Sequence, residues 1–85
     1  MIQNKEKIKN KIIYRSSYRG TKEMDILLSS FVNKYIESFD EKLLNELNNF
    51  LNFEDETILN YYHYDLVESD IDKNKISKIF KSFKI

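Results

Sequence analysis

Apolar residues recur along this chain at intervals of three and four residues, the spacing of one face of an α-helix. Alternation at every second residue, which would indicate strands, is not seen. The clearest stretch covers residues 21–39, where the apolar positions are Met24, Leu27, Leu28, Phe31, Val32, Tyr35, Ile36 and Phe39. Such a stripe predicts an amphipathic helix that buries one face.

Four shorter stretches repeat this pattern, with boundaries good to about three residues. We expect helices over residues 5–18, over 41–51, directly after the acidic residues 54–56, and over 72–83. Their apolar positions are Ile8, Ile12 and Ile13; Leu43, Leu44, Leu47, Phe50 and Leu51; Ile58, Leu59, Tyr61 and Tyr62; and Ile76, Ile79, Phe80 and Phe83. The pattern therefore predicts an all-α fold, a compact bundle of about five short helices in a single domain of residues 1–85.

Local signals suggest where these helices end. Gly20 is expected to close the first helix in the left-handed conformation, which glycine adopts without a steric penalty. Ser38 or Asp40 is expected to cap the third helix in a capping box. Glu23 falls in the first turn of the second helix, and it would be the third helical residue if Gly20 were the N-cap. In the last helix the acids stand at the start and the lysines towards the end, as the helix dipole prefers.

The composition excludes several kinds of chemistry. The 85 residues include no Cys, no Pro, one Gly and a single His, His63. Disulfides, thiolate nucleophiles and zinc fingers are therefore excluded, as are glycine-rich phosphate loops. We expect no catalytic residues and no metal site. His63 has no second ligand near it in the sequence, so we expect it at the surface or in the packing of the fourth helix. No apolar run is long enough to span a bilayer, and the N-terminus lacks a signal region.

Charge is unevenly distributed although the formal net charge is zero. Residues 1–22 contain seven Lys or Arg and one acid, residues 23–72 two Lys and thirteen acids, and residues 73–85 five Lys and no acid. A basic arm can bind nucleic acid. The alternative, which we favour, is that the basic ends pair with the acidic middle or are solvated.

The densest polar cluster lies at the junction of the first two predicted helices, Tyr18-Arg19-Gly20-Thr21-Lys22-Glu23-Met24-Asp25. A purely local explanation is available for each residue. The arginine suits a helix C-terminus at the edge of the core, the glycine suits a turn, and the two acids suit the first turn of a helix.

Residues 11–28 also closely resemble the signature of the succinate dehydrogenase flavinylation factors. The hallmark of that family is Arg-Gly-x-x-Glu, often with a further acid, here Arg19, Gly20, Glu23 and Asp25. The flanks agree, because an aliphatic pair and an aromatic precede the motif and an apolar helix follows it. The resemblance extends more weakly over most of the chain. Tyr61 stands where the family usually has Trp, and Thr21 where it usually has Met or Leu.

The resemblance implies a function. Members of this family are small helical proteins that promote covalent attachment of FAD to the flavoprotein subunit of succinate dehydrogenase and, in some bacteria, of fumarate reductase. The bond joins a histidine of that subunit to the 8α-methyl carbon of the flavin. The chain would then be an assembly chaperone and not an enzyme, with no tightly bound cofactor of its own, because the FAD is attached to the partner. We expect a free monomer that binds no nucleic acid and does not insert into membranes. Its location would be the bacterial cytoplasm, or the mitochondrial matrix for a processed eukaryotic form.

The same resemblance places the partner-binding residues at the junction. They are Arg19, Gly20, Glu23 and Asp25, flanked by Tyr14, Arg15 and Tyr18. We expect Arg19→Ala to leave the helical fold intact and to impair flavinylation. Two other functions stay open on the sequence alone, a small nucleic-acid-binding module and an antitoxin-like regulatory protein.

Overall fold

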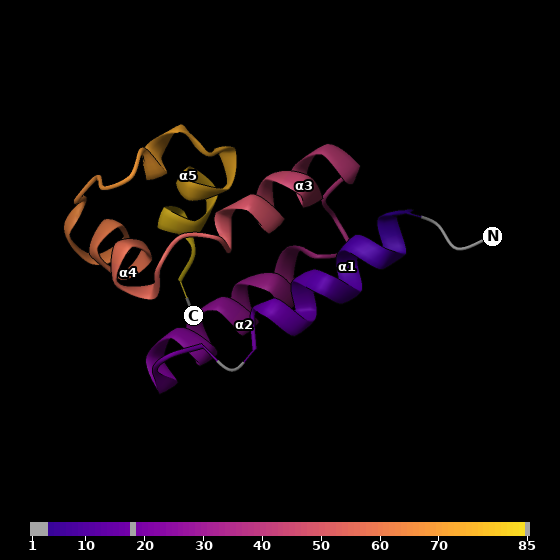
Figure 1. The fold of residues 1–85 in the computed structure, drawn as a ribbon, viewed down its shortest axis with the longest axis horizontal. Helices are drawn as coiled ribbons and strands as arrows, with labels where there is room; N and C mark the ends of the chain where they lie inside the picture. Colours follow the sequence, from indigo (N-terminus) through magenta and orange to yellow (C-terminus); the bar gives the residue numbers. More distant parts are fainter. Residues whose placement is uncertain (1–3, 18, 85) are drawn as a thin grey trace.

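The computed structural model describes residues 4–17 and 19–84, and over these residues the regular structure is all helical, with no strand. The elements are α1 (Asn4–Arg15), α2 (Lys22–Tyr35), α3 (Glu41–Phe50), α4 (Asp55–Tyr64), the 3-10 helix η1 (Ile71–Lys73) and α5 (Lys75–Ser82). Figure 1 shows α1 and α2 along one side of the molecule and α3, α4 and α5 along the other. The predicted all-α fold class is confirmed.

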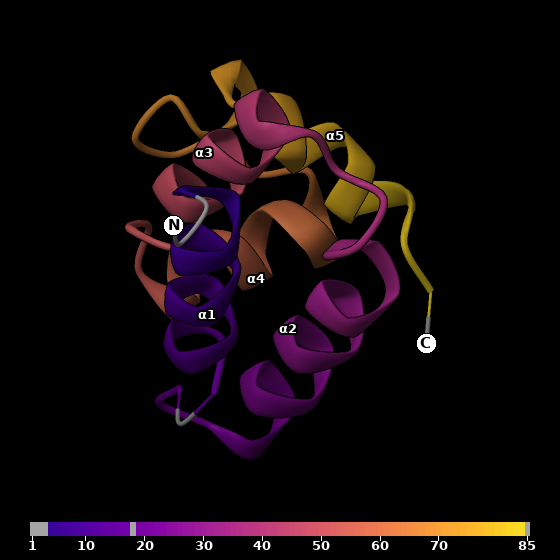
Figure 2. The ribbon, with the colours of Figure 1, turned by 90° about the vertical axis from the view of Figure 1, so that its right-hand side faces the viewer.

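The helices enclose one hydrophobic core. α1 packs against both α2 and α3, α3 packs against α5, and α5 packs against α4 and η1. In Figure 2, α1 and α2 lie side by side and the other helices close over them. Aromatic rings fill the centre: Phe31 of α2 meets Phe80 of α5 at 5.1 Å between ring centroids, and Phe80 meets Phe50 of α3 at 5.3 Å. Such edge-on and tilted contacts stabilise beyond simple area burial.

The predicted apolar stripe of α2 is buried nearly in full. Its buried members are Met24, Leu27, Leu28, Phe31, Val32, Ile36 and Phe39, and Tyr35 packs partly buried beside them. The prediction for α1 is wrong at one position, because Ile13 is 45% exposed. The buried line on this helix instead runs through Lys9, Ile12 and Ser16. These three positions share one helical face, and Ile13 lies about 100° away from Ile12.

The junction between α1 and α2 differs from the prediction. α1 ends at Arg15, three residues earlier than expected, and Thr21 is the N-cap of α2, its hydroxyl accepting from the Met24 N–H at 3.2 Å. Gly20 does not close α1 in the left-handed conformation, because its φ is not positive. It is not the N-cap of α2 either, because Thr21 takes that position. Glu23 accordingly occupies the second helical position and not the third.

Two other helix starts are also set by polar side chains. Asp40 caps α3 by accepting from the Leu43 N–H at 2.9 Å, whereas the Ser38 hydroxyl donates back to Tyr35 and takes no part in the cap. The last predicted helix is broken in two at Asn74, whose side chain caps α5 at the Ile76 N–H. The acidic end expected for this helix falls in η1, so the first turn of α5 contains no acid.

Candidate partner-binding site

Arg19 lies where the ends of three helices meet. Its Nη1 donates to the carbonyl of Arg15, the last residue of α1, at 3.2 Å, and more weakly to that of Leu51, the C-cap of α3, at 3.4 Å. Its Nη2 donates to the Phe53 carbonyl at 3.2 Å. A cation is favourable beside the carbonyl ends of helices, where backbone acceptors have no helical partner. The Arg19 side chain is only 13% exposed, so its position at the edge of the core agrees with the sequence pattern.

Asp55, the first residue of α4, completes this arrangement. Its Oδ1 accepts from Nε of Arg19 at 2.8 Å and forms an ion pair with Nη2 at 2.8 Å, and its Oδ2 accepts from the Gly20 N–H at 2.7 Å. A Cβ at Gly20 would lie 3.0 Å from that same Oδ2. The glycine therefore makes room for a close approach to the chain's own carboxylate, and it does not serve a left-handed turn.

Asp25 binds the same segment from the other side, since its carboxylate accepts from the backbone N–H of Arg19. We call Arg19, Gly20, Asp25 and Asp55 the junction network. Its members come from the α1–α2 connection, from α2 and from the start of α4. Because most of their polar atoms are engaged within the chain, the network acts first as a structural clamp on these three segments.

Glu23 has a different environment. Its side chain is 58% exposed, and its Oε2 lies 2.9 Å from Nε2 of His63, whose side chain is 40% exposed. This contact ties the start of α2 to the end of α4. The Glu23 carboxylate thus contacts His63, whereas Arg19 pairs with Asp55. The His63 partner is 40 residues away in the sequence, and no local pattern indicated it.

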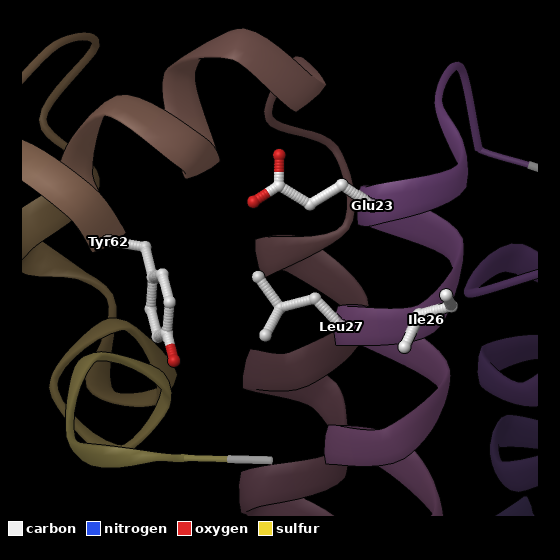
Figure 3. Close-up of a pocket in the computed structure, with 4 residues that line it drawn as sticks. All are labelled: Glu23, Ile26, Leu27 and Tyr62. Carbon is white, nitrogen blue, oxygen red and sulfur yellow. The ribbon is translucent and has the colours of Figure 1, made fainter.

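A hollow of about 260 Å³ opens between the start of α2 and the end of α4. It is lined by Glu23, Ile26, Leu27 and Tyr62. In Figure 3, Glu23 and Leu27 extend from α2 towards Tyr62 on α4. The Tyr62 hydroxyl donates to the Phe83 carbonyl at 2.6 Å and its ring packs on Phe80, so this wall is fixed. Ile26 is 46% exposed at the mouth. We call this feature the α2–α4 hollow.

The flanking candidate residues separate into two groups. Tyr14 is 76% exposed and accessible to a partner. Arg15 is engaged internally, donating to the Asn48 carbonyl at 2.9 Å and to the side-chain oxygens of Asn48 and Asn52. Tyr18 lies outside the described residues. Among the predicted site residues, Gly20, Glu23 and Tyr14 are thus exposed, whereas the side chains of Arg15, Arg19 and Asp25 bind within the chain.

Basic groups near both ends of the chain contact acids in its middle. Lys9 binds Glu37 at 3.1 Å, Arg19 binds Asp55, and Lys81 binds Asp65. This agrees with the pairing we favoured for the charge pattern over a free basic arm. The hydrogen bond to the Glu37 carboxylate raises the pKa of Lys9 above its ordinary value.

Two features are absent from the part of the chain that the structure describes. No helix there is long and apolar enough to cross a membrane. The same residues contain no group of three or more acidic or histidine side chains placed to hold a metal ion.

The fold and the junction network together define a small helical domain in which internal polar contacts lie beside an exposed hollow. The chain belongs to the family described as the flavinator of succinate dehydrogenase, whose model matches residues 10–84. The resemblance inferred from the Arg-Gly-x-x-Glu motif and its flanks is thereby confirmed.

Curated relatives carry a consistent name, "Succinate dehydrogenase assembly factor 2, mitochondrial". The protein from Scheffersomyces stipitis is 39% identical over 75 residues, covering 84% of this chain and 48% of that protein. The protein from Debaryomyces hansenii is 35% identical over 75 residues, covering 84% and 51%. The Drosophila virilis protein is 44% identical over 48 residues, covering 48% and 30%. The chain thus spans about half the length of these relatives or less. No solved structure matches it.

Proposed function

We propose that this chain is an assembly factor that binds the flavoprotein subunit of succinate dehydrogenase and promotes covalent attachment of FAD to it. The observation that carries the proposal is the match of residues 10–84 to the flavinator family. The names of the curated relatives, which are assembly factors of the same enzyme, support it. The flavoprotein subunit of fumarate reductase is included in the proposal as a second partner.

The geometry suits a positioning role. Bond formation between a histidine and the flavin needs both groups held in near-attack geometry, and a docked partner can select that geometry. The clamp around Arg19 and Asp55 gives the junction a defined shape before any partner arrives, which lowers the ordering cost of docking. Gly20 and Glu23 then face outward from this rigid base. The chemistry itself belongs to the flavin and the flavoprotein, so we infer that this chain supplies no bond-making group.

We also propose an oligomeric state, a cofactor state and a compartment for this chain. The chain acts as a monomer when free, it holds no FAD of its own, and it meets the flavoprotein subunit in the compartment where that subunit folds. This compartment is the matrix for a mitochondrial protein and the cytoplasm for a bacterial one.

The test is covalent flavin on the flavoprotein subunit. The subunit is co-expressed with and without this chain in cells that lack their own factor, then denatured and run on a gel that is read for flavin fluorescence. We expect a strong band only when the chain is present. Glu23→Ala should weaken the band, because it removes the exposed carboxylate of the motif. Glu41→Ala is the matched control, since it removes an exposed acid from the first turn of α3. Equal bands with and without the chain would reject the proposed function.

A further inference from the structure

Two polar contacts tie α4 to the segment beside the α2–α4 hollow. Asp55, at the start of α4, binds Arg19 and Gly20, and His63, near the end of α4, binds Glu23. The Cα atoms of α2 and α4 lie mostly more than 8 Å apart. The hollow lies between these two backbones, and Asp55 and His63 tie the two ends of α4 to the segment from Arg19 to Glu23.

The walls of the hollow specify what it can hold. Ile26, Leu27 and Tyr62 are apolar or aromatic, and Glu23 supplies the one charged group of the lining. His63 contacts Oε2 of Glu23, so Oε1 is the oxygen that remains for another donor. A volume of about 260 Å³ is smaller than the roughly 300–1,000 Å³ of sites for drug-sized ligands. It suits one inserted side chain and is too small for a dinucleotide.

We propose that the α2–α4 hollow is a docking site for a segment of the partner protein that inserts one apolar side chain and places an adjacent lysine or arginine against Glu23. This inference rests on the proposed function, in which the partner is the flavoprotein subunit. Glu23 belongs both to the Arg-Gly-x-x-Glu motif and to the wall of the hollow, so a partner that covers the motif also covers the hollow.

Charge favours a basic segment as the occupant. Glu23 is the one charged residue of the lining, its Oε2 contacts His63, and Lys22, one residue before it, does not line the hollow. Glu54 and Glu56, which flank the clamp residue Asp55, are both exposed. A lysine or arginine beside the inserted side chain would complement these acids and steer the approach of the partner.

The hollow can be tested with two isoleucines of nearly equal exposure. Ile26, at its mouth, is 46% exposed, and Ile13, on α1, is 45% exposed. The affinity of the purified flavoprotein subunit for the chain is measured by titration calorimetry with Ile26→Asp and with Ile13→Asp. Both substitutions place an acid in a helix at an exposed position, although the acid is less favourable in the last turn of α1 than near the start of α2, so the stability of each variant is measured as well. We expect Ile26→Asp to weaken binding about tenfold or more, and Ile13→Asp by less than about twofold.

The proposed ion pair between Glu23 and the partner is tested separately, through the salt dependence of binding. Glu23→Gln preserves the shape of the side chain and removes its charge. We expect it to weaken binding several-fold at low salt and to flatten the salt dependence of the dissociation constant, because an ion pair with the partner would be lost. If the salt dependence of the dissociation constant were the same in Glu23→Gln as in the wild type, the proposal of a basic occupant would be overturned.

The other outcomes distinguish failure of the proposed function from failure of the docking site. If the wild-type chain does not bind the flavoprotein subunit, the proposed function fails and the docking site fails with it. If the wild type binds and the two isoleucine variants lose affinity equally, the docking site is rejected while the proposed function stands. Circular dichroism checks the fold of each variant. If Ile26→Asp is unfolded, Ile26→Ala against Ile13→Ala takes its place, with an expected loss of about threefold at Ile26 alone.

Discussion

Replacing Arg19 by alanine should destabilise the whole domain, contrary to the expectation from the sequence. The substitution removes the ion pair with Asp55 and the hydrogen bonds to the carbonyls of Arg15, Leu51 and Phe53. These contacts join the end of α1, the end of α3 and the start of α4. Their loss affects how three helices meet and is not confined to one surface position.

The magnitude follows from the exposure of the ion pair. Breaking a fully buried pair costs about 3–5 kcal/mol, and an exposed pair contributes about 0–1 kcal/mol. The side chains of Arg19 and Asp55 are 13% and 23% exposed, so about 2 kcal/mol is reasonable for this pair. The carbonyls gain water in exchange for the lost donors, which adds about 1 kcal/mol. A loss of about 3 kcal/mol is a large part of the roughly 4–13 kcal/mol available to 85 residues. It should lower Tm by roughly 10–25 °C.

The assay is thermal and urea unfolding followed by circular dichroism. Lys22→Ala is the matched control, because it removes an exposed cation from the same junction and should change stability by less than about 0.5 kcal/mol. Arg19→Lys should recover part of the loss, since lysine keeps the charge without the planar fork that reaches several acceptors. An Arg19→Ala variant as stable as Lys22→Ala would refute this reasoning. In that case Arg19 would be available to a partner, as the family motif alone suggested.

Three other substitutions test separate contacts. Gly20→Val should cost about 1–3 kcal/mol because its branched side chain would displace the Asp55 carboxylate; unfolding free energies measure this, and a neutral effect would contradict the close approach. His63→Leu should lower partner affinity about threefold by releasing Glu23, whereas His63→Gln, which keeps a donor, should retain it; equal losses in titration calorimetry would contradict a positioning role. For Lys9, a folded-state pKa above the ordinary 10.5 means that its pair stabilises the domain fully below pH 10.5, and that this contribution is lost as pH rises through the folded pKa. Tm measured against pH should therefore fall more steeply above pH 10.5 in the wild type than in Lys9→Met, and parallel curves would contradict the pairing.

The helices and most of the core could be predicted because both depend on local spacing. The apolar stripe of α2 has the period of a helix, so its buried face followed directly from the sequence. The error at Ile13 arose because a short helix bearing few apolar residues does not define its own orientation. Beside Ile12, the core accepts Ser16 and the aliphatic part of Lys9, whereas the sequence alone suggested Ile13.

The polar junction could be located from the sequence but not understood from it. The Arg-Gly-x-x-Glu motif marked the correct segment, yet the partner that explains both Arg19 and Gly20 is Asp55, more than 30 residues away. The same holds for the contact between Glu23 and His63. Contacts between distant side chains depend on how the helices assemble, and no periodicity within one helix contains that information.

The most direct test of the account is the rate of covalent flavin attachment in a purified system. The apo flavoprotein subunit is incubated with FAD, with and without this chain, and acid-precipitated samples are read for protein-bound flavin over time. The account predicts that the chain raises the rate, that the effect saturates as docking sites fill, and that Glu23→Ala reduces it more than Glu41→Ala does. An identical rate with and without a folded chain would contradict the account.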